Sequence, residues 1–362
     1  MASDTYFVPL EQGENPSSAG KKMAELWDRS GAGGHFKKGA YVAVKTHFGE
    51  SDNDTFVHPA MVTAIVRKLK QGGAKPFLAE TSTLYRGSRS NAVDHLALAN
   101  DHGFGYEAVK APIIMVDGLL GDSEVEIEID GKHFKKVNVA REIAKANGIV
   151  VLSHFTGHLA SGFGAAIKNI GMGLSSRRGK LRQHSVMSPS INGTRCTACG
   201  ECIKWCPQDT ISLVEGKAVI HKENCIGCGE CYAVCAFGAV MFDWRRESVP
   251  LQEMMAEHAA GVARAVSGNL FYFNVLVNIT KNCDCMNGGK ALSRDIGIVA
   301  GRDLVAVEKA SYDLFKEVNG KSLEAIAYPH INALVQVEHA ERLGLGSRDY
   351  RLVKIGLGAQ SR

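Results

Sequence analysis

The sequence predicts an α/β fold, in which a mostly parallel sheet with flanking helices is interrupted by a cysteine-rich insertion. Short apolar runs of strand length alternate with longer segments whose apolar residues recur at helical spacing. Eight of the ten cysteines lie between residues 196 and 235. Apolar residues make up 45% of the 362 residues, which is enough for a large core.

Six runs are predicted to be buried parallel strands, because each is short, continuous and apolar. Three of them precede the cysteine-rich stretch and three follow it. The runs are 41–45, 76–79, 148–152, 270–277, 296–300 and 304–307.

Helices are predicted over 59–70, 251–266 and 330–343, where apolar residues recur every three or four positions. Two further segments, 124–129 and 133–137, flank an Asp-Gly pair. This pattern predicts a β-hairpin that lies beside the sheet.

The clustered cysteines form two copies of one spacing, C-x2-C-x2-C-x3-C. In bacterial-type ferredoxins this spacing holds two [4Fe-4S] clusters, and the fourth cysteine of each copy binds the cluster of the other copy. The sequence therefore predicts a two-cluster ferredoxin module. The predicted ligands are Cys196, Cys199, Cys202 and Cys235 for the first cluster, and Cys225, Cys228, Cys231 and Cys206 for the second.

Two other uses of these cysteines fit the sequence less well. A disulfide framework needs an oxidising compartment, and residues 1–10 lack the apolar segment of a signal peptide. A zinc ribbon uses two C-x2-C pairs and leaves four thiols without a role. Pro207 follows its cysteine as in ferredoxins, whereas Ala236 stands at the equivalent position of the second copy. We expect this difference to loosen a turn without removing a ligand.

The module is expected to divide the α/β domain. Strands and helices alternate on both sides of it, so residues 190–243 are predicted to be an insertion between residues 1–189 and 244–362. The basic stretch before the module, residues 175–184, is expected to be a solvated linker. A patch that binds an anion or an acidic partner is the alternative for this stretch.

Charge and hydropathy exclude two classes of partner. The formal net charge of +4 is small for a dedicated nucleic-acid binder. No run of 18 apolar residues is present, so no membrane span is expected. The absence of a signal peptide predicts a cytoplasmic location, where thiols bind metal more readily than they form disulfides.

Polar residues follow four of the predicted strands, and such strand ends form the ligand-binding edge of an open parallel sheet. We therefore expect these residues to meet in one cleft. His47, His154 and His158 are candidate catalytic residues. Lys168 is a fourth candidate, because it lies in a glycine-rich stretch, 162–173, that lacks nucleotide-binding motifs and is expected to line the cleft.

Cys283 and Cys285 form a C-x-C pair after the strand predicted at 270–277. Three interpretations stay open for them: a metal site, a redox dithiol, or two unrelated buried thiols. With one of the cleft histidines they would form a soft nitrogen–sulfur site suited to zinc or iron.

Four segments carry a resemblance to a known family: VAVKTHFGE, VVLSHFTGHLASGFGAAIKNIGMG, KNCDC and DLVAVEKASYDLF. Together with the two-cluster insertion, they resemble the ferredoxin-fused branch of the family called domain of unknown function 362, over nearly the whole chain. The resemblance implies a cytoplasmic iron–sulfur protein of the type found in anaerobes. It assigns no catalytic residue.

These observations predict an oxidoreductase, in which electrons pass between two clusters and a small-molecule substrate or third metal in the α/β cleft. A non-catalytic electron-transfer subunit, whose α/β body docks a redox partner protein, is the main alternative. A structural or sensory cluster protein is the third. An enzyme requires His47, His154 and Cys283 to lie close together in one cleft, whereas a docking body requires a broad exposed apolar patch.

Overall fold

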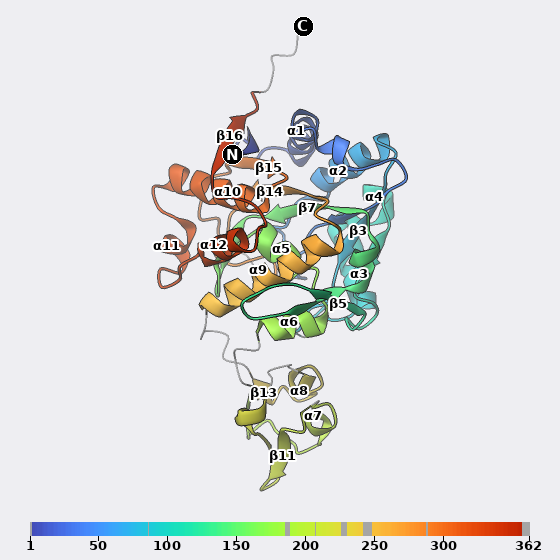
Figure 1. Ribbon diagram of the computed structural model, residues 1–362, viewed down its shortest axis with the longest axis vertical. Helices are drawn as coiled ribbons and strands as arrows, with labels where there is room; N and C mark the ends of the chain where they lie inside the picture. Colours follow the sequence, from blue (N-terminus) through green and yellow to red (C-terminus); the bar gives the residue numbers. More distant parts are fainter. Residues whose placement is uncertain are drawn as a thin grey trace.

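The structure is a computed structural model whose centre is an eight-stranded sheet with helices on both faces (Figure 1). It describes residues 2–85, 87–184, 189–206, 208–225, 230–241, 248–286 and 289–356. In spatial order, the strands are β16 (Tyr350–Lys354), β1 (Ser3–Pro9), β15 (Gly297–Gly301), β14 (Leu270–Leu276), β7 (Gly148–His154), β2 (Tyr41–Lys45), β3 (Lys75–Glu80) and β4 (Ile113–Met115).

The sheet is mostly parallel, as predicted. Only β15 runs antiparallel to its neighbours β1 and β14 among the described strands, and the other neighbouring pairs are parallel. The expectation that residues 296–300 form a parallel strand was therefore wrong. The chain returns from β14 to β15 without an intervening helix, and strands joined in this way pair antiparallel.

Residues 304–307 are not a strand, and this prediction was also wrong. They form the first turn of helix α10 (Leu304–Asn319), which Asp303 caps by accepting a hydrogen bond of 2.9 Å from the backbone N–H of Ala306. A short apolar run has the same pattern in a buried helix as in a buried strand.

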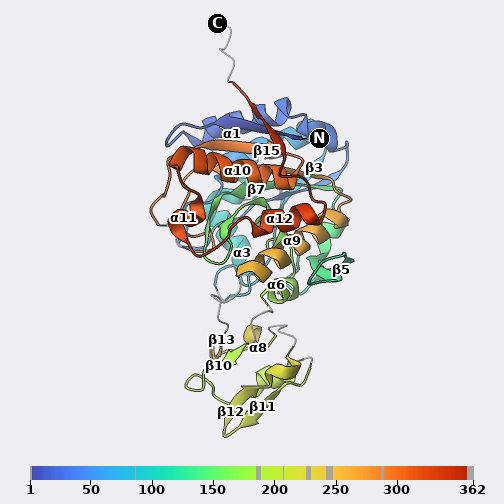
Figure 2. The ribbon, with the colours of Figure 1, turned by 60° about the vertical axis from the view of Figure 1, so that its left-hand side comes forward.

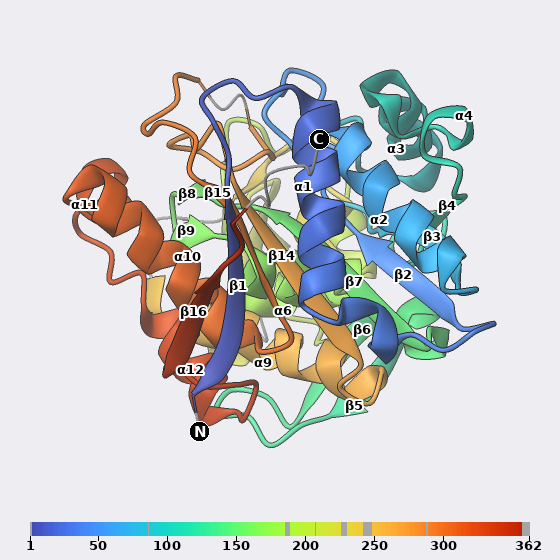
Figure 3. The ribbon, with the colours of Figure 1, turned by 90° about the horizontal axis from the view of Figure 1, so that it is seen from above.

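Helices cover both faces of the sheet (Figure 3). Alternate residues of β7 point to opposite faces: Val150 and Leu152 pack with helices α1 and α2, whereas Ile149 and Val151 belong to the core that contains α5, α9, α10 and α12. The helices are α1 (Pro16–Arg29), α2 (Pro59–Gln71), α5 (Ala166–Gly171), α9 (Ser248–Ala265) and α12 (Val335–Arg342).

The predicted hairpin is present, with a longer connection than expected. Strand β5 (Glu124–Glu128) pairs with β6 (Lys136–Ala140), so that seven residues connect them rather than the three, 130–132, between the predicted strands. The second strand does not begin at His133, because the backbone N–H groups of His133 and Phe134 donate to the Glu257 carboxylate at 3.0 and 2.8 Å.

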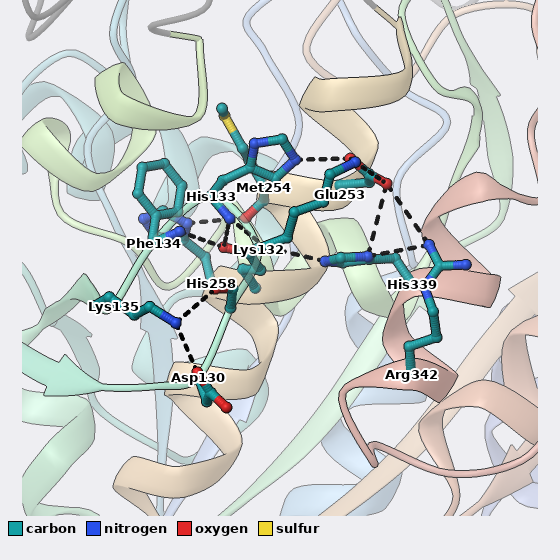
Figure 4. A network of polar contacts seen from close by, with 12 residues as sticks. Asp130, Lys132, His133, Phe134, Lys135, Glu253, Met254, His258, His339 and Arg342 are labelled. Atoms are coloured by element: carbon teal, nitrogen blue, oxygen red, sulfur yellow. Dashed lines mark hydrogen bonds and ion pairs between the residues drawn. The ribbon is translucent and has the colours of Figure 1, made fainter.

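Glu257 belongs to a buried polar network that joins this hairpin to α9 and α12 (Figure 4). His339 of α12 places its Nε2 atom 3.1 Å from the Glu257 carboxylate. One helical turn earlier, Glu253 accepts from the Nε2 atom of His133 at 2.7 Å. Burial would raise the pKa of Glu257, but the hydrogen bonds from His339, His133 and Phe134 hold it below its usual value.

Residues 190–241 form a small lobe outside the main sheet (Figures 1 and 2). Its two ends meet, because β10 (Ser190–Ile191) pairs antiparallel with β13 (Val240–Met241). The lobe has a hydrophobic cluster of its own, which includes Ile211, Val240 and several cysteines. Its other elements are α7 (Glu201–Lys204), the β11 (Ile211–Val214) and β12 (Lys217–Ile220) hairpin, and α8 (Glu230–Ala233).

The basic stretch before the lobe is a helix and not a solvated linker. Helix α6 (Arg177–Gln183) begins after Ser176, whose hydroxyl accepts from the backbone N–H of Gly179 at 3.0 Å. Lys180 is buried and donates to the Thr81 hydroxyl at 2.6 Å. The remaining elements are α3 (Ala92–Ala99), α4 (Tyr106–Val109), β8 (Thr156–His158), β9 (Gly162–Gly164) and α11 (Leu323–Ala327), together with single turns at 32–35, 100–104, 141–145 and 222–224.

Candidate functional site

A cavity of about 460 Å³ lies at the carboxyl ends of the parallel strands. Strands β2, β3 and β7 end at Lys45, Glu80 and His154, which all line it, and the segment after β14 closes it. The structure brings the six candidate residues of the α/β domain together here: His47, His154, His158, Lys168, Cys283 and Cys285.

A buried ion pair that the sequence did not single out forms the floor of this site. The ammonium group of Lys45 lies 2.9 Å from the Glu80 carboxylate and donates to the Asn169 side chain at 2.8 Å. Burial alone would raise the pKa of Glu80, but Lys45 and other nearby positive groups lower it to about 2. The sequence does contain a signal for this ion pair, a lysine at the end of an otherwise apolar strand. It was overlooked because Lys45 was counted as part of the strand.

His47 is directed toward the cysteine pair. Its Nδ1 atom accepts from the backbone N–H of Gly49 at 2.9 Å. That Nε2 atom lies 3.4 Å from the Cys285 sulfur and 2.8 Å from a terminal nitrogen of Arg89. Arg89 is itself buried and donates to Glu50 at 3.1 Å.

The two cysteines lie on a tight turn. The backbone N–H of Met286 donates to the carbonyl oxygen of Cys283 at 3.0 Å, which closes a turn with Asp284 and Cys285 in its middle. The carboxylate of Asp284 accepts from the Thr55 hydroxyl at 2.9 Å, so the turn is fixed to the loop after β2.

His154 fixes the same turn from the other side. Its Nδ1 atom lies 2.8 Å from the Asp284 carboxylate, and its Nε2 atom lies 2.8 Å from the carbonyl oxygen of Val277. Both partners are acceptors, so both ring nitrogens donate and the ring is positively charged. Burial would lower the pKa of His154, but Asp284 raises it. His154 therefore has no lone pair for a metal, in contrast to the proposed ligand role.

The charges around Cys285 favour its thiolate. Hydrogen bonding from the Cys283 thiol lowers the pKa of Cys285 well below its usual value, and Lys168, His47 and Arg89 lower it further. The same bond raises the pKa of Cys283 well above its usual value. The ammonium group of Lys168 lies 4.0 Å from the Cys285 sulfur.

His158 is neutral and contributes a proton donor. Its Nδ1 atom accepts from the backbone N–H of Ser161 at 3.1 Å, so the proton resides on Nε2. Burial and the nearby charge of Lys168 lower the pKa of His158 well below 6.5.

In the part of the chain that the structure describes, no group of three or more His, Cys, Asp or Glu side chains is placed to hold a metal ion. In the large cavity, His47 and Cys285 are a close nitrogen–sulfur pair, but His154 is occupied by its own partners. A third metal site at Cys283 and Cys285 therefore stays a prediction without a preformed ligand set.

A second, smaller cavity lies inside the lobe, and four cysteines line it: Cys196, Cys199, Cys202 and Cys235. Burial raises the pKa of Cys202, and electrostatic repulsion from the other three cysteines of this cavity raises it further. The left-handed backbone of Gly200, with φ of +78°, turns the chain around this cavity. In a [4Fe-4S] cluster each cysteine binds a different iron, so the four sulfurs surround a space rather than meet at one ion.

Backbone amides donate to the sulfurs of the lobe. The N–H groups of Ala218, Thr210 and Ala239 lie 3.4, 3.4 and 3.2 Å from the sulfurs of Cys196, Cys206 and Cys235, respectively. Burial would raise the pKa of Cys206 and Cys235, but hydrogen bonds lower both. Of the second predicted ligand set, Cys206, Cys225 and Cys231 lie within the lobe, whereas Cys228 lies outside the described residues.

The lobe contributes a side chain to the large cavity. Tyr232 of α8 lies on its wall, together with Leu251 at the start of α9. Tyr232 stands between Cys231 and Cys235 in the sequence. Residues on both sides of the lobe in the chain, His184 and Leu251, also line the cavity.

These features define an α/β protein with a charged cavity at its strand ends and a cysteine-lined lobe beside it. The chain belongs to the family described as domain of unknown function (DUF362), which matches residues 42–313. No curated protein matches the chain. Among the described residues, no helix is long and apolar enough to cross a bilayer.

Two solved structures resemble the chain at low identity. One is the lactate racemase apoprotein from Thermoanaerobacterium thermosaccharolyticum, with 15% identity and a TM-score of 0.38 over 79% of this chain and 54% of that one. The other is a protein from Thermotoga maritima, with 11% identity and a TM-score of 0.39 over 86% of this chain and 60% of that one. The chain thus spans less than two thirds of the length of either protein.

Proposed function

We propose that the chain is an iron–sulfur oxidoreductase, in which two [4Fe-4S] clusters in the lobe exchange electrons with a substrate in the α/β cavity. The observation that carries this proposal is the position of Tyr232, which lines the substrate cavity and stands between two predicted cluster ligands, Cys231 and Cys235. A plain electron carrier would need no such contact with a second cavity.

The residues of the lobe fit the first cluster. Its four predicted ligands line one cavity, although Cys235 is distant in sequence from the other three. Backbone N–H donors to two of these sulfurs, those of Cys196 and Cys235, would stabilise negative charge on them. When bound, such clusters supply one-electron transfer.

The residues of the large cavity fit a reaction that moves charge and protons. Lys168 and Arg89 place positive charge near Cys285, and they would hold an anionic group of the substrate. His158 presents a ring N–H group there, because its Nδ1 atom accepts from the backbone N–H of Ser161, and the Nε2 atom of His47 lies 3.4 Å from the Cys285 sulfur. Buried apolar residues such as Leu251 and Ala165 complete the lining.

The lobe offers a candidate docking surface for a redox partner. Trp205, Leu213 and Phe237 of the lobe have exposed fractions of 56%, 48% and 49%. Exposed large apolar side chains in one small lobe are typical of a docking surface. We propose that an external electron donor or acceptor binds the lobe at this surface.

Anaerobic purification of the full chain, followed by iron and sulfide analysis, tests the proposal. We expect about eight irons and about eight sulfides per chain, and electron paramagnetic resonance signals of reduced clusters after dithionite treatment. Cys199→Ala should lose one cluster, about half of the iron. Thr197→Ala, which alters a neighbouring residue of the same small cavity, should keep all of it. Bound zinc without sulfide would refute the cluster assignment.

A further inference from the structure

We infer that Cys283 and Cys285 form a dithiol–disulfide centre in the large cavity, which stores the electron pair that two one-electron clusters deliver or remove. The inference rests on the proposed function for its source of electrons. The geometry and the charges of the pair support it separately.

The turn brings the two thiols within bonding range. Two residues apart, their Cα atoms can be separated by no more than about 7.3 Å, and disulfides need roughly 4.4–6.8 Å. The turn that Met286 closes shortens this separation, and both cysteines line the same cavity. No large backbone movement is required to join them.

The turn is held rigidly, which limits the rearrangement between the two redox states. Thr55 and His154 both bond the Asp284 carboxylate, and the backbone N–H of Glu50 donates to the Asp284 carbonyl oxygen at 3.1 Å. The side chain of Asn53 donates to the carbonyl oxygen of Met286 at 2.9 Å. The residue between the cysteines therefore stays in place while the sulfurs react.

The surroundings are those of a reactive thiol rather than of a structural one. Structural cysteines lie in apolar pockets, where burial keeps the thiol protonated and inert. Cys285 instead lies on the cavity wall, 4.0 Å from the Lys168 ammonium and 3.4 Å from the His47 ring. Positive charge from Lys168, which acts on both sulfurs and lies 4.0 Å from that of Cys285, stabilises the thiolate that is released when the disulfide is reduced.

The step balances with one proton. Reduction breaks the Sγ–Sγ bond and consumes two electrons, which two bound clusters would supply one at a time. Cys285 is released as a thiolate beside Lys168, and Cys283 takes up one proton from solvent to become a thiol. Oxidation by a substrate reverses the step, because the sulfurs rejoin, two electrons leave and the Cys283 proton is released.

The test equilibrates the full chain, purified anaerobically, with dithiothreitol buffers of increasing oxidised fraction. Acid quenching, alkylation and mass spectrometry then report the state of the peptide that contains both cysteines. We expect conversion from the doubly alkylated form to an internal disulfide, lost in both Cys283→Ser and Cys285→Ser. A peptide that stays dithiol at every ratio would overturn the inference. So would a metal ion beyond the cluster irons that is lost from both variants.

Lys168→Met separates a charge-tuned centre from two cysteines that merely lie close together. Removing the ammonium group should shift the equilibrium toward the disulfide by about tenfold, because the released thiolate loses its nearest lysine charge. Lys281→Met is the matched control, since that ammonium group lies over the Tyr328 ring at 5.3 Å, and we expect no shift. An equal shift in both variants would contradict the assigned role of Lys168.

Iron and sulfide are measured in the same samples, so the two proposals can fail independently. If the clusters are absent while the disulfide forms reversibly, the proposed electron source fails and the dithiol centre stands. If the clusters are intact and the peptide never forms a disulfide, the dithiol centre fails and the cluster assignment stands.

Discussion

The chain surrounds its sulfurs in two different ways. In the lobe, the sulfurs of Cys196, Cys206 and Cys235 accept from backbone N–H groups. In the α/β cavity, the sulfur of Cys285 faces the charged side chain of Lys168 and the ring of His47.

The groups that surround the sulfurs indicate what chemistry each region is suited to. Backbone donors carry no titratable proton, so their effect on a sulfur is the same across a wide pH range. Side-chain charges change with protonation, which couples the state of the sulfur to protons. The lobe is thus suited to electrons alone, and the cavity is suited to electrons and protons together.

The largest expected effect is at Glu80, because the α/β cavity contains buried charged groups that stabilise each other. Glu80→Gln leaves Lys45 as a buried cation without its carboxylate, and we expect a loss of about 3–5 kcal/mol in the free energy of unfolding. Chemical denaturation of the full chain, followed by the unfolding of the α/β body, measures this loss. The double variant Lys45→Met, Glu80→Gln should recover at least about half of the loss. If the double variant recovers none of the lost stability, Lys45 and Glu80 do not stabilise each other.

The pH dependence of the same pair has a definite sign. The folded pKa of Glu80 is about 2, below its usual 4.5. Its contribution to stability is therefore complete above about pH 4.5 and is lost as the pH falls toward 2. The Glu80→Gln variant should lack this part of the acid transition.

A buried carboxylate outside the cavity gives a smaller effect. Glu257→Gln replaces the charged acceptor of the His133, Phe134 and His339 hydrogen bonds, and we expect a loss of about 1.5–3 kcal/mol. The pKa of Glu257 is lowered in the folded state, so the difference from the parent protein should disappear as the pH falls below about 4.5. A difference that persists unchanged in acid would mean that the loss comes from packing.

The smallest effect is expected in the lobe. Thr210→Val removes a hydroxyl that lies 3.3 Å from the Cys206 sulfur, but it keeps the backbone N–H donor. We expect a change of about 1 kcal/mol or less in stability and unchanged iron content. A large loss of iron in this variant would show that side chains, and not the backbone, stabilise the sulfurs of the lobe.

Much of the fold was predictable from local pattern. Strands β2, β3, β7 and β14 and helices α2 and α9 lie where the apolar periodicity placed them. Strand β1 was missed, because its alternating, half-polar sequence is typical of a sheet margin rather than of a buried strand. Its partners come from the far end of the chain, and no local signal reports such a pairing.

The site was predictable only in part. The rule that ligands bind beyond the strand ends correctly predicted that His47, His154 and Cys285 line one cavity. It could not show that His154 is a charged anchor for Asp284, because that role depends on contacts between distant segments. Arg89 was missed for the same reason, since it follows no strand directly and reaches His47 from a loop.

The position of the insertion has a kinetic consequence. His184 and Leu251, on the two sides of the lobe in the chain, both line the large cavity. An electron donor tethered at the mouth of its own acceptor site reacts at a fixed effective concentration, independent of how dilute the protein is in the cell. Under the proposed function, the internal transfer would be a first-order event, and only the supply of electrons to the lobe would depend on encounters with another molecule.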